Sequence, residues 1–122
     1  MITSFRDLEV WQMGIDVTVR VYRVTCTLPA EEKFGLMSQM RRAAVSVPAN
    51  IAEGWARDHT AEYLRHLSIA RGSLAELETH LVIAVELDYV KESRMRELNG
   101  AIEQLGRKLN TLQQALRQRL QK

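Results

Sequence analysis

Apolar residues recur at alternating spacings of three and four along four segments of this chain. Such spacing puts them on one side of an α-helix, at the positions through which helices of a left-handed bundle pack. The last segment is the most regular, with Met95, Leu98, Ile102, Leu105, Leu109, Leu112 and Leu116. Two earlier segments repeat the pattern, at Leu67, Ala70, Leu74, Leu77, Leu81 and Ala84 and at Met37, Met40, Ala44, Val47 and Ile51. The first segment carries two stripes, Leu8, Trp11, Ile15 and Tyr22 on one and Val10, Val17, Val21, Val24 and Leu28 on the other.

The breaks between these segments are short. Leu28-Pro29-Ala30 closes the first helix, because proline pushes the residue before it away from helical dihedral angles. Residues 58–62 separate the second helix from the third, with Asp58 or Thr60 as the expected N-cap, and residues 88–93 precede the fourth, with Ser93 as its cap. Short connections favour antiparallel neighbours. We therefore predict an all-α fold, a single domain over residues 1–122 built as an up-down-up-down antiparallel four-helix bundle.

Composition limits the class of protein. The chain has 122 residues, of which 46% are hydrophobic and 26% charged. No apolar run approaches the roughly 20 residues of a membrane span, and the N-terminus lacks the apolar core of a signal peptide, so we expect a cytoplasmic protein without membrane contact. The single cysteine, Cys26, excludes an intramolecular disulfide and is interpreted as a small buried apolar residue.

The net charge of +2 is unevenly distributed. Residues 93–122 hold seven basic side chains against two acidic ones, whereas the remainder of the chain is slightly acidic. Such asymmetry is typical of a basic interaction surface or of head-to-tail association between subunits, and also of an ordinary solvated helix face.

The second helix contains a proline, Pro48, within Ser46-Val47-Pro48-Ala49-Asn50-Ile51-Ala52-Glu53-Gly54. An interior proline removes a helical hydrogen bond and costs about 3 kcal/mol or more. We expect Ser46 or Asn50 to compensate the carbonyls that it frees. At 100° per residue, six polar residues lie within about 40° of one line, and we call them the polar ladder: Gln39, Arg42, Ser46, Asn50, Glu53 and Arg57.

Two interpretations of the polar ladder stay open. In the structural one, which we favour, Gln39, Ser46, Pro48, Asn50, Glu53 and Gly54 belong to a hydrogen-bonded network that sets helix register or a subunit interface. In the functional one, Arg41, Arg42 and Arg57 reach a ligand such as a phosphate backbone. A stripe of small residues on the third helix, Ser68, Gly72, Ala75 and Thr79, indicates a close contact either within the chain or between subunits.

No pattern in the sequence points to catalysis. A di-iron bundle needs glutamate and histidine three residues apart on two helices, whereas Glu62–His66 and Glu76–His80 are four apart on one helix. We interpret these pairs as solvent-facing or capping ion pairs. Glycine-rich phosphate loops and nucleophile-elbow motifs are missing too. We therefore expect a protein that is not an enzyme, with no metal, cofactor or small-molecule substrate.

Three motifs together resemble one family. They are Phe5-Arg6-Asp7-Leu8-Glu9-Val10-Trp11, the run from Gln39 to Gly54, and residues 69–79, Ile-Ala-Arg-Gly-Ser-Leu-Ala-Glu-Leu-Glu-Thr. They are similar to the four helix bundle proteins encoded within intervening sequences of bacterial 23S ribosomal RNA genes. The resemblance covers residues 5 to about 90, and the last helix matches only in its amphipathic character.

This resemblance implies a homopentameric ring and no catalytic residues. The wider family includes the accessory variability determinant of diversity-generating retroelements, a basic pentamer that binds nucleic acid and a reverse transcriptase. In a ring, five copies of a basic helix would add their charge, and clustered phosphate contacts strengthen binding. The leading hypothesis is an oligomer that binds RNA, DNA or a nucleic-acid-handling protein. Its candidate contacts are Arg41, Arg42, Arg57, Arg107, Lys108, Arg117 and Arg119. The alternative is a protein–protein scaffold.

Overall fold

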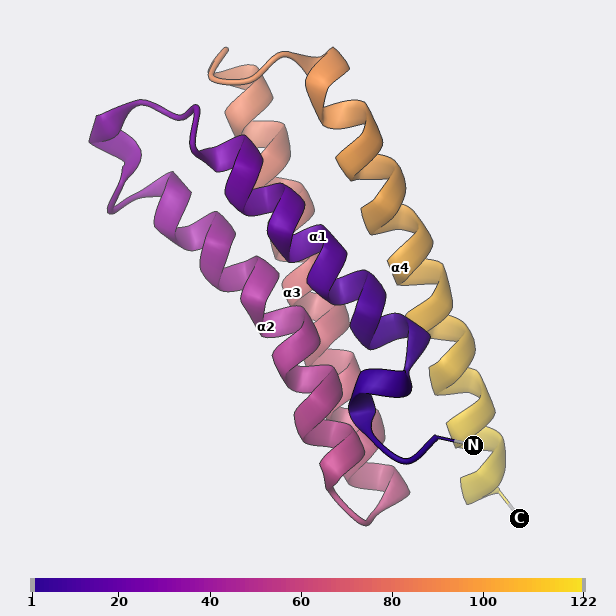
Figure 1. Ribbon diagram of the computed structural model, residues 1–122. Helices are drawn as coiled ribbons and strands as arrows, with labels where there is room; N and C mark the ends of the chain where they lie inside the picture. The colour runs from indigo at the N-terminus through magenta and orange to yellow at the C-terminus, as the bar shows by residue number, and fades with distance from the viewer. Residues whose placement is uncertain (1, 122) are drawn as a thin grey trace.

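The computed structural model describes residues 2–121 as four long helices and two short 3-10 helices. The long helices are α1 (Glu9–Thr25), α2 (Leu36–Ala56), α3 (Thr60–Glu86) and α4 (Glu92–Leu120). The 3-10 helices are η1 (Phe5–Asp7) and η2 (Ala30–Glu32), and the described residues contain no strand. Successive long helices run in opposite directions along the bundle (Figure 1). The predicted all-α four-helix bundle is confirmed, and Pro48 lies inside α2 as expected.

The helices occupy the corners of a square. α1 packs against α2 and α4, and α3 packs against the same two helices. No Cα atom of α1 lies within 8 Å of a Cα atom of α3 over the described residues, so these two helices lie at diagonal corners, with α3 behind α1 in Figure 1. Each helix consequently keeps one face turned away from the core.

The core consists of the predicted seams. All six seam residues of α3 are buried, and so are those of α4 except half-buried Leu112. In the first segment the valine stripe is buried, whereas the other stripe is buried at Leu8, half-buried at Trp11 and exposed at Ile15 and Tyr22. A corner helix that touches two neighbours can bury one arc of its surface only. The sequence, with two apolar stripes on this helix, did not separate the core stripe from the exposed one.

The helix ends differ from the prediction in detail. α3 has His59 at its N-cap and α4 has Lys91, each in extended backbone conformation and without a side-chain capping bond. The expected caps Asp58, Thr60 and Ser93 are therefore wrong, since Thr60 and Ser93 already lie within the helices. α1 ends at Thr25, three residues before Leu28.

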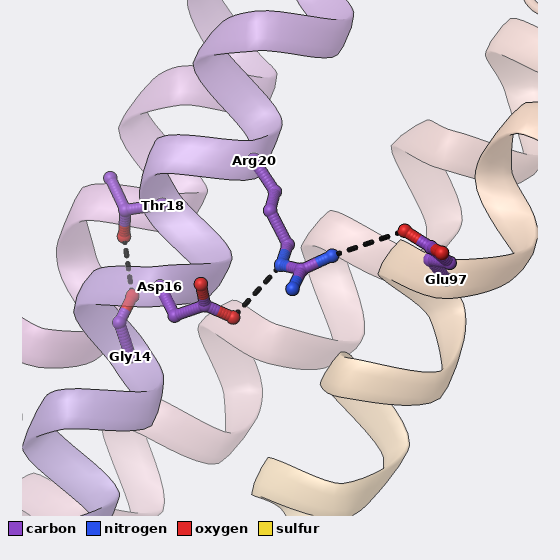
Figure 2. Close-up of polar contacts among 5 residues, drawn as sticks. All are labelled: Gly14, Asp16, Thr18, Arg20 and Glu97. Atoms are coloured by element: carbon purple, nitrogen blue, oxygen red, sulfur yellow. Dashed lines mark hydrogen bonds and ion pairs between the residues drawn. The ribbon is translucent and has the colours of Figure 1, made fainter.

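Pro48 is accommodated by α1 rather than by its own helix. Without an N–H, Pro48 cannot bond to the carbonyl of Ala44 four residues back. The hydroxyl of Thr18 lies 3.1 Å from that carbonyl and 2.8 Å from the carbonyl of Gly14, so its proton is shared between the two. Figure 2 shows the bond from Thr18 to Gly14. A Cβ at Gly14 would lie 3.2 Å from Cβ of Pro48, which explains why a glycine fits here.

The expected compensation by Ser46 or Asn50 within α2 is therefore wrong. Asn50 Nδ2 does donate to the carbonyl of Ser46, at 2.8 Å. The carbonyl that Pro48 leaves without a helical donor is that of Ala44, and Thr18 supplies its hydrogen bond. Spacing within one helix could not predict this donor, because it comes from another helix.

Arg20 links α1 to α4 at the exposed edge of the bundle. Its guanidinium pairs with Asp16 at 2.9 Å and with Glu97 of α4 at 3.5 Å (Figure 2).

Among the described helices, none is both long enough and apolar enough to cross a membrane.

Candidate functional site

A chain of hydrogen bonds joins the middle of the polar ladder to α3. The hydroxyls of Ser46 and Ser73 lie 2.8 Å apart, and Asn50 Nδ2 donates to Ser46 Oγ at 3.0 Å. Because the amide nitrogen of Asn50 is used in this way, its oxygen Oδ1 accepts from His66 Nδ1, at 3.1 Å. The network therefore holds the imidazole of His66 with its proton on Nδ1.

His66 and His80 lie on the side of α3 that faces the bundle. The exposed fraction is 3% for His66 and 8% for His80, so the expectation of solvent-facing ion pairs is wrong. His66 Nε2 and His80 Nδ1 are buried and have no hydrogen-bond partner within residues 2–121. Residues seven apart repeat on one helix face, and this face meets α2.

Gly54 lets α2 and α3 approach each other beside this network. A Cβ at Gly54 would lie 2.7 Å from Cβ of His66 and 3.1 Å from Cδ1 of Tyr63. Any side chain larger than hydrogen would push the two helices apart. Gly54 thus belongs to the geometry that brings Asn50 within hydrogen-bonding distance of His66.

The ends of the polar ladder have other surroundings. Glu53 and Arg57 form an exposed ion pair at 3.4 Å. At the other end, Gln39 and Arg42 line an open groove of about 480 Å³, together with Ala43, Ser46, Ser73 and Glu76. The polar ladder is therefore one face of α2 with a hydrogen-bonded middle and two solvated ends.

Arg41 lies on a different face of α2 from Arg42 and Arg57. Its Nε donates to Thr25 Oγ1 at 2.9 Å and Nη2 donates to the carbonyl of Tyr22 at 3.3 Å. The guanidinium also lies 4.5 Å from the centre of the Tyr22 ring and 3.6 Å from the sulfur of Cys26. These contacts tie α2 to the C-terminal end of α1, where a positive charge is favourable.

Cys26 is exposed, so the interpretation of a buried apolar cysteine is wrong. It follows the last residue of α1 and lies outside the valine stripe that forms the core.

The basic residues of α4 spread around the helix. Lys108 pairs with Glu9 of α1 at 3.0 Å. Arg107, Arg117 and Arg119 are exposed and form no ion pair with the described residues.

Burial raises the pKa of the Tyr63 phenol above its ordinary value, and the positive charge of Arg119 partly offsets that rise.

A second polar network, between α3 and α4, was missed from the sequence. Gln113 is fully buried, donates from Nε2 to Ser68 Oγ at 3.0 Å and accepts from Arg71 Nη1 at 2.9 Å. The available signal was its position, four residues after Leu109 and three before Leu116, on the apolar seam. A glutamine at such a position specifies how two helices align.

The small-residue stripe of α3 faces solvent. Ser68, Gly72, Ala75 and Thr79 are all exposed, and a Cβ at Gly72 would meet nothing within 4 Å. Ser68 nevertheless accepts a hydrogen bond from Gln113 of α4, so the stripe touches another helix of the same chain at that end, whereas Gly72, Ala75 and Thr79 are left exposed. Within residues 2–121, no three His, Cys, Asp or Glu side chains gather where they could hold a metal ion.

Comparisons with known proteins agree with this fold. A crystal structure of a protein with unknown function from the S23 ribosomal protein family of Bacteroides thetaiotaomicron superposes with a TM-score of 0.78, at 21% identity, over 84% of this chain and 96% of that one. A search of curated proteins finds no match. The family model for 23S rRNA-intervening sequence proteins matches residues 6–111 and thus reaches into α4, beyond the limit of about residue 90 expected from the motifs. The chain therefore belongs to the family of 23S rRNA-intervening sequence proteins.

Proposed function

We propose that this protein is a non-enzymatic homo-oligomeric module that binds RNA or DNA through the basic surface of α4, or engages a nucleic-acid-handling protein such as a reverse transcriptase there. The observation that carries the proposal is the exposed, uncompensated charge of Arg107, Arg117 and Arg119 on α4. Phosphates attract such cations and release condensed counterions on binding. Lys122 would add to this charge but lies outside the described residues.

Of the seven basic residues predicted to contact nucleic acid, several already bond to other residues of the chain. Arg41 already bonds to Tyr22 and Thr25, and Arg57 and Lys108 are paired with carboxylates. Their guanidinium and ammonium groups would have to give up these partners to reach a phosphate. Arg42 is exposed but lies on α2, at the groove that also contains Glu76. The three free arginines of α4 are thus the preferred contacts.

The non-enzymatic part of the proposal is supported by how the polar side chains are used. Ser46, Ser73, Asn50 and His66, the groups that could serve as nucleophile or base, bond to one another between α2 and α3. These four side chains are thus engaged in the packing of two helices, which supports a role other than catalysis.

Fluorescence anisotropy with a structured RNA and with duplex DNA, measured from low to moderate salt, tests the proposal. We expect binding whose affinity falls steeply with salt, and a double variant Arg117→Glu/Arg119→Glu that binds more weakly and with a slope reduced by about 0.9 per lost phosphate contact. The matched control is Lys33→Glu/Lys91→Glu, which changes the net charge equally at the opposite end of the bundle. If the protein binds neither nucleic acid up to tens of micromolar at low salt, direct binding is excluded.

A protein–protein scaffold without nucleic-acid binding is the second candidate. It is favoured by the apolar side chains that the bundle leaves exposed, among them Val19 and Val82. Under this alternative, the α4 variants leave partner binding unchanged. Asn50→Ala breaks the bond to His66 within one chain and is expected to lower the stability of the bundle.

A further inference from the structure

Exposed apolar side chains lie on the outer side of α1 and on α2, which packs against it. Ile15, Val19 and Tyr22 recur at helical spacing on the outer side of α1, and Val45 of α2 is exposed as well. We call these four residues the α1 face. Each is about two-fifths exposed, although the valine stripe of the same helix is buried. Contiguous exposed apolar surface on a small protein commonly marks an interaction site.

A second exposed surface lies on α3. Gly72, Ala75 and Thr79 form a strip of small side chains, and Val82 and Ile83 continue it toward the C-terminal end of the helix. We call these five residues the α3 face. Val82 is 60% exposed, the most of any large apolar side chain described within the four long helices. Small side chains on one helix allow a facing helix to approach closely. The small side chains of the α3 face could therefore accommodate the larger side chains of the α1 face.

The charges beside the two faces have opposite signs. Arg23 and Arg41 flank the α1 face and form no ion pair with the described residues. Asp16, the acidic residue beside them on α1, is already paired with Arg20 (Figure 2).

The α3 face is flanked by carboxylates. Glu76, Glu78 and Glu86 are exposed, and each lacks an ion-pair partner within residues 2–121. Of the basic residues of α3, Arg65 pairs with Glu62, and Arg71 bonds to the uncharged Gln113, so the three carboxylates exceed the positive charge on this side of the helix. The two faces are thus complementary in charge as well as in side-chain size.

We propose that the α1 face of one copy packs against the α3 face of the next, in a head-to-tail contact between copies of this chain. The inference rests on the homo-oligomer of the proposed function and names the surfaces that build it. α1 and α3 lie at diagonal corners, so a copy cannot cover its own α3 face with its own α1 face. A two-fold contact of either face with itself would bring like charges together, which is destabilising.

Two single substitutions test the contact, each placing a repelling charge on one exposed face. Val19→Glu sets a carboxylate opposite the acidic α3 face, and Ala75→Arg sets a bulky cation opposite the basic α1 face. We expect each variant alone to give the monomer mass of 14.0 kDa by native mass spectrometry, where the wild type gives a multiple of it. Because both positions are exposed, circular dichroism should remain that of the wild type.

Mixing the two variants identifies the head-to-tail geometry. A mixture retains one intact pair of faces, the α1 face of Ala75→Arg and the α3 face of Val19→Glu, so complexes of two or more chains should reappear. Leu120→Glu and Ala115→Arg, which introduce the same charges on α4, are matched controls that should keep the wild-type assembly.

The outcomes separate this inference from the proposed function. If the wild type is itself a monomer at all concentrations, both the oligomer and this contact are overturned. If the wild type assembles but either variant still forms dimers or larger species, or if mixing restores nothing, the head-to-tail contact alone is overturned. Nucleic-acid binding through α4 is measured separately by fluorescence anisotropy, so its failure is distinguishable from a failure of the head-to-tail contact.

Discussion

The hydroxyl of Thr18 is expected to stabilise the bundle because of a proline on another helix. Thr18→Val keeps the shape of the side chain but removes the donor that lies 3.1 Å from the carbonyl of Ala44. That carbonyl has no helical donor, since residue 48 is proline, and Ala44 is fully buried. A buried acceptor left without a hydrogen bond costs about 1–3 kcal/mol. Because the hydroxyl proton is shared with Gly14, we expect a loss of about 1–2 kcal/mol.

A double-mutant cycle separates this effect from any general cost of the substitution. Pro48→Ala supplies a backbone N–H that can bond to the carbonyl of Ala44. In that background, Thr18→Val should cost less than about 0.5 kcal/mol, the range of an uninvolved substitution. The coupling between the two sites should therefore be about 1 kcal/mol. Thr111→Val, which removes an exposed hydroxyl bonded to the carbonyl of Arg107, is the control and should change little.

Urea unfolding followed by circular dichroism at 222 nm measures these differences. All variants need the same protomer concentration, because self-association adds to apparent stability. A loss from Thr18→Val that is equally large with proline and with alanine at position 48 would refute the reasoning. The hydroxyl would then act through packing or through Gly14, and the proline would be accommodated in some other way.

Two further effects on stability follow from the contact between α2 and α3. Gly54→Ala should cost about 1–3 kcal/mol through overpacking, because the new Cβ would lie 2.7 Å from Cβ of His66. Gly100→Ala, with nothing within 4 Å, should instead stabilise α4 by about 0.5–1 kcal/mol in the same urea unfolding assay. Equal effects at both positions would contradict the close approach. Tyr63→Phe should raise the stability slightly at neutral pH, because the hydroxyl is buried without a partner in the described chain. Since burial raises the pKa of Tyr63, the unfolded chain loses its proton first, and wild-type stability should fall as pH rises above about 10. Tyr63→Phe should show a shallower alkaline decline in urea titrations, and an unchanged decline would exclude this role.

The apolar pattern was sufficient to predict the number and order of the helices and the core residues of α2, α3 and α4. Seam residues such as Leu98 and Leu105 are buried as expected, because a three–four repeat leaves a long helix only one way to hide its apolar side. Helix ends were less accurate, since Asp58, Thr60 and Ser93 were all plausible caps by residue type. In the structure, the N-cap positions of α3 and α4 are occupied by His59 and Lys91.

The candidate site was predictable only as a set of residues on one helix. Spacing grouped Ser46 and Asn50, but their partners Ser73 and His66 lie on α3 and could not be assigned from local spacing. Grouping of the arginines was misleading for Arg41, whose guanidinium turns to α1.

By itself, the sequence determined the all-helical architecture, the positions of the seams and the resemblance to the family. Each of these depends on local periodicity or on motifs within one segment. Only the tertiary structure decided which helices are neighbours. It therefore also decided that Thr18 donates to the carbonyl left without a helical donor by Pro48, and which of the two stripes on α1 belongs to the core. It also showed that the α1 face and the α3 face lie at diagonal corners with opposite flanking charges, because burial and pairing are properties of contacts between segments distant in the chain.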